Sequence, residues 1–346
     1  MQPVQPVQRV QQHQTQQRQD STIDLITPNY DAGSVNNTVS VLLGNGYGTF
    51  QAKQDYAVGP QPYSVFSIDV NHDSKIDLIT ANVNGRSVSV LLGNGNGTFQ
   101  ATQDYTVGSQ AWSVFGMDVN QDSKIDLITA NGAGNSISVL RGKGNGSFPS
   151  ASVFPALAQP YSVFCIDING DSKIDLITPN FGGNTVKMFL GNGDGTFYSN
   201  QDYAVGTQPR SVFGMDVNQD EQIDLITTNT GGDSVSVLLG NGDATFQAKQ
   251  DYAAGTEPWS VFLIDVNQDE QIDLITANAG GDSVSVLLGN GNGTFQAKQD
   301  YAVGTQPWSV FLIDVNQEAQ IDLITANAGG NSVSVLLGNG NGTFEA

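Results

Sequence analysis

Short loops in this sequence carry oxygen-bearing side chains at alternate positions. The first holds Asp69, Asn71, Asp73 and Asp77, at positions 1, 3, 5 and 9 of the loop. Ca²⁺ takes roughly six to eight hard oxygen ligands, and a loop that curls around the ion supplies them at such a spacing, with a backbone carbonyl from position 7. The pattern therefore predicts a calcium site. Four more loops repeat it: Asp118, Asn120, Asp122 and Asp126; Asp167, Asn169, Asp171 and Asp175; Asp216, Asn218, Asp220 and Asp224; and Asp265, Asn267, Asp269 and Asp273.

The remaining predicted ligands come from position 7 and from a sixth loop. The sixth loop has a longer carboxylate at position 5, which is expected to fit the ion less well. Gln16 and Arg18 stand where acids or Asn are needed in the first repeat, so no ion is expected there, and the total is five or six Ca²⁺. The position-7 carbonyls are those of Lys75, Lys124, Lys173, Gln222 and Gln271, and the sixth loop is Asp314, Asn316, Glu318, Gln320 and Asp322.

An alternative interpretation needs no metal, because Asp and Asn also form hydrogen-bonded turns between strands. Against it, three acids in one small loop repel each other without a counter-ion. The chain has 13 Lys and Arg against 34 Asp and Glu, a net charge of −21, and six Ca²⁺ would bring this to −9. An EF-hand is excluded because position 12 is Thr80 instead of a bidentate Glu, and strands flank the loop.

A repeat of 49 residues positions these loops. The string DLIT begins at Asp24 and, after a first gap of 53 residues that reflects an insertion within 30–37, recurs every 49 residues up to Asp322. Each unit contains four strand-like runs; in the sixth they start at Trp259, Asp273, Ser283 and Thr294. Asn-Gly turns supply the positive φ angles of a tight hairpin between the last two runs.

Four strands per repeat of this length favour a radial propeller over a linear solenoid, because the ring buries both faces of each sheet. We therefore expect an all-β fold, a β-propeller of about seven four-stranded blades, formed by a single domain of residues 20–346. The Gln-rich residues 1–19 are expected to be disordered and show no secretory apolar region. The first and last repeats each lack one strand motif, so either residues 1–19 pair poorly or one blade stays incomplete.

The motif D-[VI]-N-x-D-x-x-x-D-L followed by L-[LR]-G-[NK]-G-x-[GA]-[TS]-F resembles FG-GAP/VCBS repeats, the units of integrin-α-type propellers. The resemblance covers residues from about 20 to 346. It implies metal loops between the first two strands of each blade and a secreted, extracellular protein that serves adhesion or ligand recognition. Position 6 departs from the family's frequent Gly, since this chain has Ser74, Ser123, Ser172, Glu221, Glu270 and Ala319 there.

Composition and the remaining residues bear on partners. The charge of −21 argues against nucleic acid, and no stretch approaches 18 consecutive apolar residues that would span a membrane. An aromatic residue recurs where each first strand begins. One interpretation is that these rings stack on sugars, and the simpler one is that they pack at the junctions between blades. Arg210 interrupts this series. The aromatics are Tyr63, Trp112, Tyr161, Trp259 and Trp308.

Three functions follow as hypotheses. The first is a monomeric recognition module for a glycan or protein ligand. The second is a structural or engineered repeat scaffold without a ligand, which the near-identity of the last two units favours. The third, a polysaccharide lyase, is disfavoured because acid–base residues outside the repeats are scarce, with His13 and His72 the only histidines. The sequence-based expectation is therefore that the chain is not an enzyme and has no catalytic residues.

Overall fold

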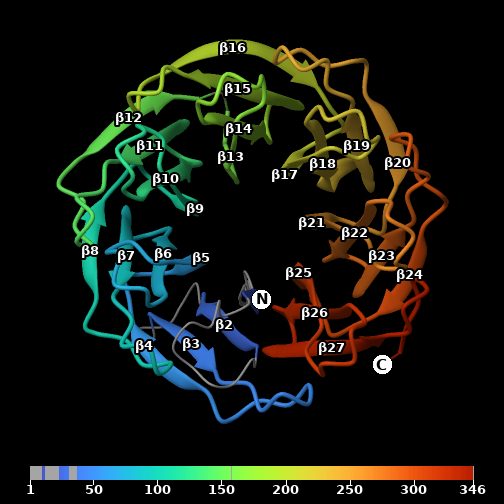
Figure 1. Ribbon diagram of the computed structural model, residues 1–346, viewed down its shortest axis with the longest axis horizontal. Coiled ribbons are helices and arrows are strands. Elements are labelled where there is room, and N and C mark those ends of the chain that lie inside the picture. The colour runs from blue at the N-terminus through green and yellow to red at the C-terminus, as the bar shows by residue number, and fades with distance from the viewer. Residues whose placement is uncertain (1–9, 12–22, 31–36, 157, 346) are drawn as a thin grey trace.

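Seven four-stranded antiparallel sheets are arranged radially around a central axis (Figure 1) in the computed structural model. It describes residues 10–11, 23–30, 37–156 and 158–345. The propeller prediction is confirmed. The only helical element in these ranges is the 3₁₀ turn Thr230–Gly232. No helix of the described residues is both long and apolar enough to cross a membrane.

Each blade takes its strands in chain order from the axis outward. In blade 2 these are β5 (Pro62–Ile68), β6 (Asp77–Asn82), β7 (Ser87–Leu91) and β8 (Gln103–Thr106). The other blades are β1 (Val10–Gln11), β2 (Asp24–Asn29), β3 (Thr38–Leu42), β4 (Gln54–Ala57); β9 (Ala111–Met117), β10 (Asp126–Asn131), β11 (Ser136–Leu140), β12 (Ala151–Pro155); β13 (Phe164–Ile166), β14 (Asp175–Asn180), β15 (Thr185–Gly191), β16 (Phe197–Ala204); β17 (Pro209–Met215), β18 (Asp224–Asn229), β19 (Ser234–Leu238), β20 (Gln250–Ala253); β21 (Pro258–Ile264), β22 (Asp273–Asn278), β23 (Ser283–Leu287), β24 (Gln299–Ala302); and β25 (Pro307–Ile313), β26 (Asp322–Asn327), β27 (Ser332–Gly338), β28 (Phe344–Glu345).

The fourth strands are shorter than their sequence pattern predicts. The run beginning at Thr294 forms a strand only over Gln299–Ala302, and Phe295 makes a single isolated bridge to Gly289. Residues 296–298, which belong to no strand, separate these two parts of the edge. Side chains of the fourth strands are largely exposed, whereas the second strands are buried along their whole length in blades 2 to 7. The apolar residues of the DLIT motif pack between neighbouring sheets, and in blade 2 its buried Asp and Thr form hydrogen bonds.

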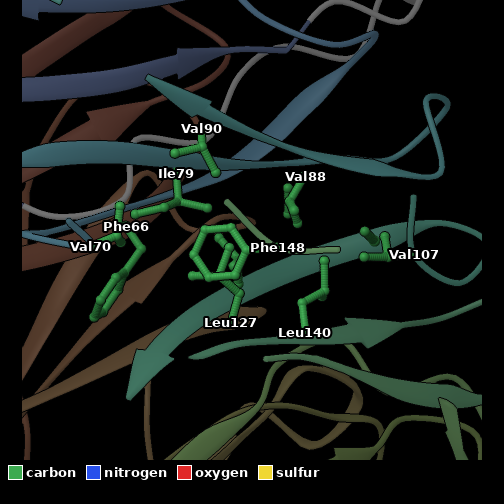
Figure 2. Close-up of a cluster of buried hydrophobic side chains, with 12 residues drawn as sticks. Phe66, Val70, Ile79, Val88, Val90, Val107, Leu127, Leu140 and Phe148 are labelled. Atoms are coloured by element: carbon green, nitrogen blue, oxygen red, sulfur yellow. The ribbon is translucent and has the colours of Figure 1, made fainter. Parts of the chain in front are cut away.

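The core lies between adjacent blades. Phe66, Ile79 and Val88 of blade 2 pack against Leu127 and Leu140 of blade 3 (Figure 2). Equivalent clusters join the other neighbouring blades around the ring. Because each sheet packs on two neighbours, the stability of one blade depends on the next, as in other repeat proteins.

A buried polar network fixes the end of each second strand. The side-chain amide of Asn82 donates to Ser87 Oγ at 3.1 Å and to Ser89 Oγ at 2.8 Å, and Ser89 Oγ donates to Asp104 on the fourth strand at 2.5 Å. Thr80 Oγ1 donates to Asn82 Oδ1 at 2.9 Å. Thr and Asn therefore act as the strand-end hydrogen-bonding groups that the sequence predicts in blades 2, 3, 5, 6 and 7, whereas Thr178 Oγ1 and Asn180 Oδ1 of blade 4 have no hydrogen-bond partner among the described residues.

The ring is closed by packing between the first and last repeats. Leu25 belongs to one cluster with Val315 and Ile324, and the amide of Gly48 donates to Val315 O at 3.1 Å. The two motif strands missing from the sequence pattern are present but only two residues long: β1 pairs with β2, and β28 pairs with β27. Of the two outcomes that the sequence left open, the structure thus shows limited pairing at the chain ends, with four strands in both terminal blades.

Two expectations fall mainly on residues that the structure does not describe. The Gln-rich segment 1–19 lies outside the described residues except for Val10–Gln11, which form β1. Gln16 and Arg18, which argue against an ion in the first repeat, and residues 31–36 of the first-repeat insertion also lie outside them.

Candidate functional site

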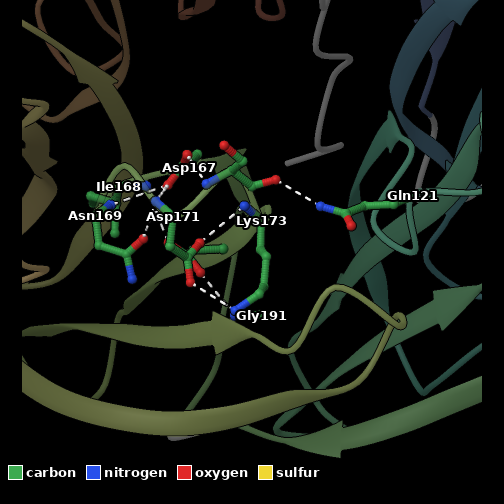
Figure 3. A network of polar contacts seen from close by, with 9 residues as sticks. Gln121, Asp167, Ile168, Asn169, Asp171, Lys173 and Gly191 are labelled. Carbon is green, nitrogen blue, oxygen red and sulfur yellow. Dashed lines mark hydrogen bonds and ion pairs between the residues drawn. The ribbon is translucent and has the colours of Figure 1, made fainter.

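The acidic loops connect the first and second strands of blades 2 to 7. They are residues 69–77, 118–126, 167–175, 216–224, 265–273 and 314–322. All lie on one face of the ring, since they follow the same end of each innermost strand. Figure 3 shows the loop of blade 4, in which Asp167, Asn169 and Asp171 face the inside of the turn.

The position-1 carboxylate organises each loop. In blade 2, Asp69 Oδ1 accepts from the amides of Asn71 and Asp73 at 3.2 Å, and Oδ2 accepts from Ser74 at 2.8 Å. His72 and Ser74 adopt left-handed backbone conformations, with φ of 61° and 64°. Position 6 therefore has the conformation for which Gly is favoured, at a cost of about 1 kcal/mol for other residues.

The position-9 carboxylate is fully buried. Asp77 Oδ2 accepts from the amide of Val70 at 2.9 Å and Oδ1 from the amide of Gly93 at 2.7 Å. Burial is the main cause that raises the pKa of Asp77 to about 6; the charges of Asp69 and Asp73 contribute to the rise, and the two amide hydrogen bonds oppose it. The three carboxylates of one loop thus interact electrostatically. The same causes raise the pKa to about 6 for Asp126, Asp175, Asp224 and Asp273.

Lysine at position 7 divides the loops into two groups. Lys75 Nζ lies 3.2 Å from Asp73 Oδ2, and the equivalent distances are 2.9 Å from Lys124 to Asp122 and 3.1 Å from Lys173 to Asp171. Each of these lysines turns back to the carboxylate at position 5 of its own loop. Gln222 and Gln271 bring no positive charge to the loops of blades 5 and 6.

The predicted ligands at positions 3 and 5 bond within the turn. In blade 3, Asn120 Oδ1 accepts from the backbone amide two residues later at 3.1 Å. In the loops without lysine, the position-3 side chain also donates to the position-5 carboxylate. Asn218 Nδ2 lies 2.9 Å from Asp220 Oδ2, and Asn267 Nδ2 lies 3.0 Å from Asp269 Oδ2. In blades 5 and 6 the predicted ligands at positions 3 and 5 are therefore partners of one another, and an ion would have to replace this side-chain contact.

The loop of blade 7 keeps the same turn despite its different position 5. The amide of Glu318 donates to Asp314 Oδ1 and Asn316 Oδ1 at 3.2 and 3.1 Å, and Asp322 accepts from Val315. The five other loops have a hydrogen bond from the position-7 amide to the position-5 Asp, which the longer Glu318 does not form in the described chain.

The donor set fits a hard cation by its chemistry. Each loop offers only carboxylate, amide and carbonyl oxygens, and a carboxylate has about four lone-pair sites, more than its amide hydrogen bonds use. As they stand, the carboxylates are engaged in the hydrogen-bonded turns of the alternative interpretation. Across the described residues, no group of three or more His, Cys, Asp or Glu has an arrangement that could hold a metal ion. Every metal ligand named from the sequence, including the position-7 carbonyls, therefore stays a prediction.

A contact between adjacent loops was not predicted from the sequence. Gln121 at position 4 donates through Nε2 to the carbonyl of Ser172 at 2.8 Å (Figure 3). Gln219 donates likewise to Glu270 at 2.9 Å, and Gln268 to Ala319 at 3.0 Å. Position 4 thus links one loop to position 6 of the next blade. The Gln in these repeats is the only sequence signal for it.

The recurring aromatics form what we call the aromatic layer: Tyr63, Trp112, Tyr161, Arg210, Trp259 and Trp308, all where the innermost strands begin. Ring centroids lie 4.6 Å apart for Tyr63 and Trp112, 5.1 Å for Trp112 and Tyr161, and 4.4 Å for Trp259 and Trp308. Packing of successive blades is thus confirmed for these residues. The layer lies on the face opposite the acidic loops, because these follow the other end of the same strands.

Comparison with known families and structures places the fold. The FG-GAP-like repeat family matches residues 69–129, 118–178, 167–227, 216–276 and 265–325. No curated protein matches. An Agrocybe aegerita lectin that recognises non-reducing terminal N-acetylglucosamine is 20% identical, with a TM-score of 0.59 and coverage of 88% of this chain and 86% of the lectin.

Two further solved structures carry the names of lactonases. A Bacteroides uniformis protein described as a 6-phosphogluconolactonase is 16% identical, with a TM-score of 0.73 and coverage of 94% of this chain and 95% of that chain. A periplasmic gluconolactonase of Pseudomonas aeruginosa is 15% identical, with a TM-score of 0.65 and coverage of 86% and 87%. Likeness at this identity shows a shared fold.

These lactonases contradict the expectation that the chain is not an enzyme. That expectation treated the loop aspartates as metal ligands alone and looked for acid–base groups elsewhere. Five of these aspartates have a pKa of about 6, at which a carboxyl group exchanges protons near neutral pH. Function lies in sites carried by a fold, so the scarcity of His in the repeats does not exclude catalysis. By its matched repeats, which span residues 69–325, this chain belongs to the family of FG-GAP-like repeat proteins.

Proposed function

We propose that this protein is a calcium-binding β-propeller that recognises a glycan or protein ligand outside the cell. The observation that carries the proposal is the recurrence of one oxygen-rich loop on the same face of six blades. In five of these loops burial, and to a smaller extent the charges of the other two carboxylates, raise the pKa of the position-9 aspartate, so a divalent cation would offset the cost of its ionisation. The net charge of −21 likewise favours the binding of cations to the whole protein.

The side chains of Asp69, Asn71, Asp73 and Asp77 would hold the ion in blade 2, with the carbonyl of Lys75 as a further ligand. Oxygen donors of this kind select Ca²⁺ over the softer transition metals. The turn already places its backbone in the conformation that the loop needs, with left-handed φ angles at positions 4 and 6. Binding to the folded state alone would stabilise the propeller.

Recognition by this protein is supported by the fold rather than by one residue. Propellers bind ligands at the two faces of the ring, and here one face carries the acidic loops and the other the aromatic layer. The Agrocybe aegerita lectin, whose ligand is a terminal N-acetylglucosamine, has a related fold. A calcium-stabilised ring would hold such a surface in a fixed shape, which reduces the entropy lost on binding.

Calorimetric titration with CaCl₂ tests the metal proposal. We expect saturable binding with Kd values of roughly 10⁻⁴–10⁻³ M, as in extracellular calcium modules. The variant Asp265→Asn should lose one site, since it removes a position-1 carboxylate. Asp251→Asn, on the outer strand β20, is the matched control and should bind as the parent protein does. Equal binding by all three proteins would overturn the assignment of the loops.

A glycan array with the calcium-loaded protein, repeated after chelation, tests recognition. Sugar binding that disappears with the chelator supports a calcium-dependent lectin. Silence of the array in both conditions, together with normal calcium binding, contradicts glycan recognition and favours a protein ligand or a scaffold.

A further inference from the structure

Arg210 is the one departure from an aromatic series. The innermost strands begin with PYSVF, AWSVF, PYSVF, PRSVF, PWSVF and PWSVF in blades 2 to 7. Every blade of this set except blade 5 has Tyr or Trp at the second position. The repeats are otherwise closely similar. A charged residue that replaces the aromatic residue in one repeat therefore indicates a role that is specific to that blade.

The guanidinium of Arg210 lies among aromatic groups from three other blades. Its Cζ is 3.5 Å from the ring centroid of Trp259 and 4.6 Å from that of Tyr161. Its Nη2 donates to the hydroxyl of Tyr63 at 2.6 Å. Tyr63 belongs to blade 2 and Arg210 to blade 5, and residues of such distant blades meet only near the axis.

Arg210 differs from the other cations in the described part of the chain. Seven lysines there each pair with an aspartate. Arg86, Arg141 and Lys143 have no such pair but are exposed. Arg210 is half-buried, and among the described residues no carboxylate pairs with it. Aromatic faces stabilise a guanidinium but leave its N–H donors, five in all, mostly unused.

A second donor in the aromatic layer also lacks an acceptor. The indole Nε1 of Trp259 is buried and has no hydrogen-bond partner among the described residues. An unpaired buried N–H is destabilising, and a ligand oxygen would satisfy it. The hydroxyl of Tyr63 lies beside the guanidinium group, held at 2.6 Å from Arg210 Nη2. Cationic, hydroxyl and indole donors therefore gather within one layer of rings.

We propose that the aromatic layer binds a carboxylate-bearing sugar, with Arg210 as the residue that selects the acid. A planar guanidinium pairs with a carboxylate through two parallel hydrogen bonds, which a neutral sugar cannot offer. Trp259 already stacks on Trp308 and lies under Arg210, so the partly exposed rings of Trp112 and Trp308 supply the apolar surface against which a pyranose ring packs. The acidic loops do not repel such a ligand, because a seven-residue strand, about 23 Å in length, separates the two faces.

This inference rests on the recognition role proposed above but not on calcium. It also assigns the ligand to one face of the ring and to one blade, whereas the loops repeat around the other face. A failure of one proposal therefore leaves the other measurable.

Intrinsic fluorescence provides a direct test, because the chain has three tryptophans and all belong to the aromatic layer. Calcium-saturated protein is titrated with glucuronate, glucose, acetate and inorganic phosphate. The proposal predicts a saturable change with glucuronate and at least about tenfold weaker responses to the other three, since each lacks either the carboxylate or the ring.

Two variants of Arg210 and one control complete the experiment. Arg210→Tyr restores the residue of blades 2 and 4 without adding a tryptophan, and Arg210→Lys keeps the charge but loses the planar fork. Both should weaken glucuronate binding by about tenfold or more. Arg86→Gln removes an exposed cation that contacts Ser109 and should bind as the parent does.

The proposal is overturned by an absent response to glucuronate, by an equal response to glucose, acetate or phosphate, or by parent-like binding in both Arg210 variants. If Arg210→Tyr does not fold, Arg210→Lys alone decides. Calcium content measured on the same sample separates the proposals: a silent titration with full metal content contradicts only the acidic-sugar site.

Discussion

Asp77 Oδ1 accepts a hydrogen bond from the backbone amide of Gly93 at 2.7 Å, so the last ligand position of the acidic loop is tied to the turn after β7. Blades 3 to 7 repeat this bond at 2.8–2.9 Å. The bond explains why two distant motifs, DLIT and GNG, occur together in each unit. One buried carboxylate serves both the fold and the proposed metal site.

A methyl group at this junction should be poorly tolerated. A Cβ at position 93 would lie 2.1 Å from the backbone oxygen of Ile76, so Gly93→Ala must displace the loop or the turn. We expect a loss of more than about 2 kcal/mol in the free energy of unfolding. Gly170→Ala is the matched control: position 170 has nothing within 4 Å and a φ of 71°, so the loss should be near ~1 kcal/mol. Denaturant unfolding measures both, and equal losses would argue against the steric explanation.

The acidic loops should couple calcium binding to pH. The folded-state pKa of the five position-9 aspartates is about 6, above their ordinary 3.8. Between these values the folded chain binds more protons than the unfolded chain, so this contribution to stability falls as pH rises and its full cost is present above about pH 6. Calcium requires the ionised form. The rise in Tm on adding calcium should therefore be larger at pH 7 than at pH 5, and an equal rise at both pH values would contradict the proposed role of these carboxylates.

Removing the lysine ion pairs should strengthen calcium binding. The triple variant Lys75→Gln, Lys124→Gln and Lys173→Gln gives the loops of blades 2 to 4 the residue found in blades 5 and 6. Because Ca²⁺ no longer competes with an ammonium group at position 5, the average affinity measured by titration calorimetry should rise severalfold. Lys53→Gln is the control, since its partner Asp55 lies on the outer strand β4. A triple variant that binds no better would show that these ion pairs do not oppose the metal.

The contact between blades should dominate stability. Leu127 is fully buried between blades 2 and 3, and Leu127→Ala should cost about 2–5 kcal/mol through lost burial and a residual cavity. Val153→Ala, on the exposed face of β12, should change the free energy of unfolding by less than about 0.5 kcal/mol. Comparable losses in the two variants would refute the assignment of the core.

Repetition made most of the fold predictable. One 49-residue period fixes the strand order, the second-strand burial and the place of each acidic loop, because every copy repeats the same alternation of apolar runs and turns. The two short terminal strands escaped prediction, since Val10–Gln11 does not resemble the first strands of the other copies, and Phe344 repeats a motif whose Phe forms only an isolated bridge in four other blades. Their pairing depends on a neighbouring strand that is already in place, not on a local preference.

The site was less predictable than the fold because its details depend on contacts between blades. Nothing near Gln121 in the sequence indicates a bond to Ser172, which lies 51 residues away. The environment of Arg210 is set by Tyr63, 147 residues distant, and only closure of the ring brings the two together. The loop positions could be named from their spacing, whereas the return of Lys75 to its neighbouring carboxylate could not, since spacing does not fix a flexible side chain.

Native mass spectrometry of the protein dialysed against calcium tests the central claim most directly, because it counts bound ions. The account predicts five or six Ca²⁺ per chain, a loss of one for each position-1 Asp→Asn substitution, and a fall in Tm when a chelator strips the ions. A chain that carries no calcium at millimolar concentration, with a Tm unchanged by the chelator, would contradict it.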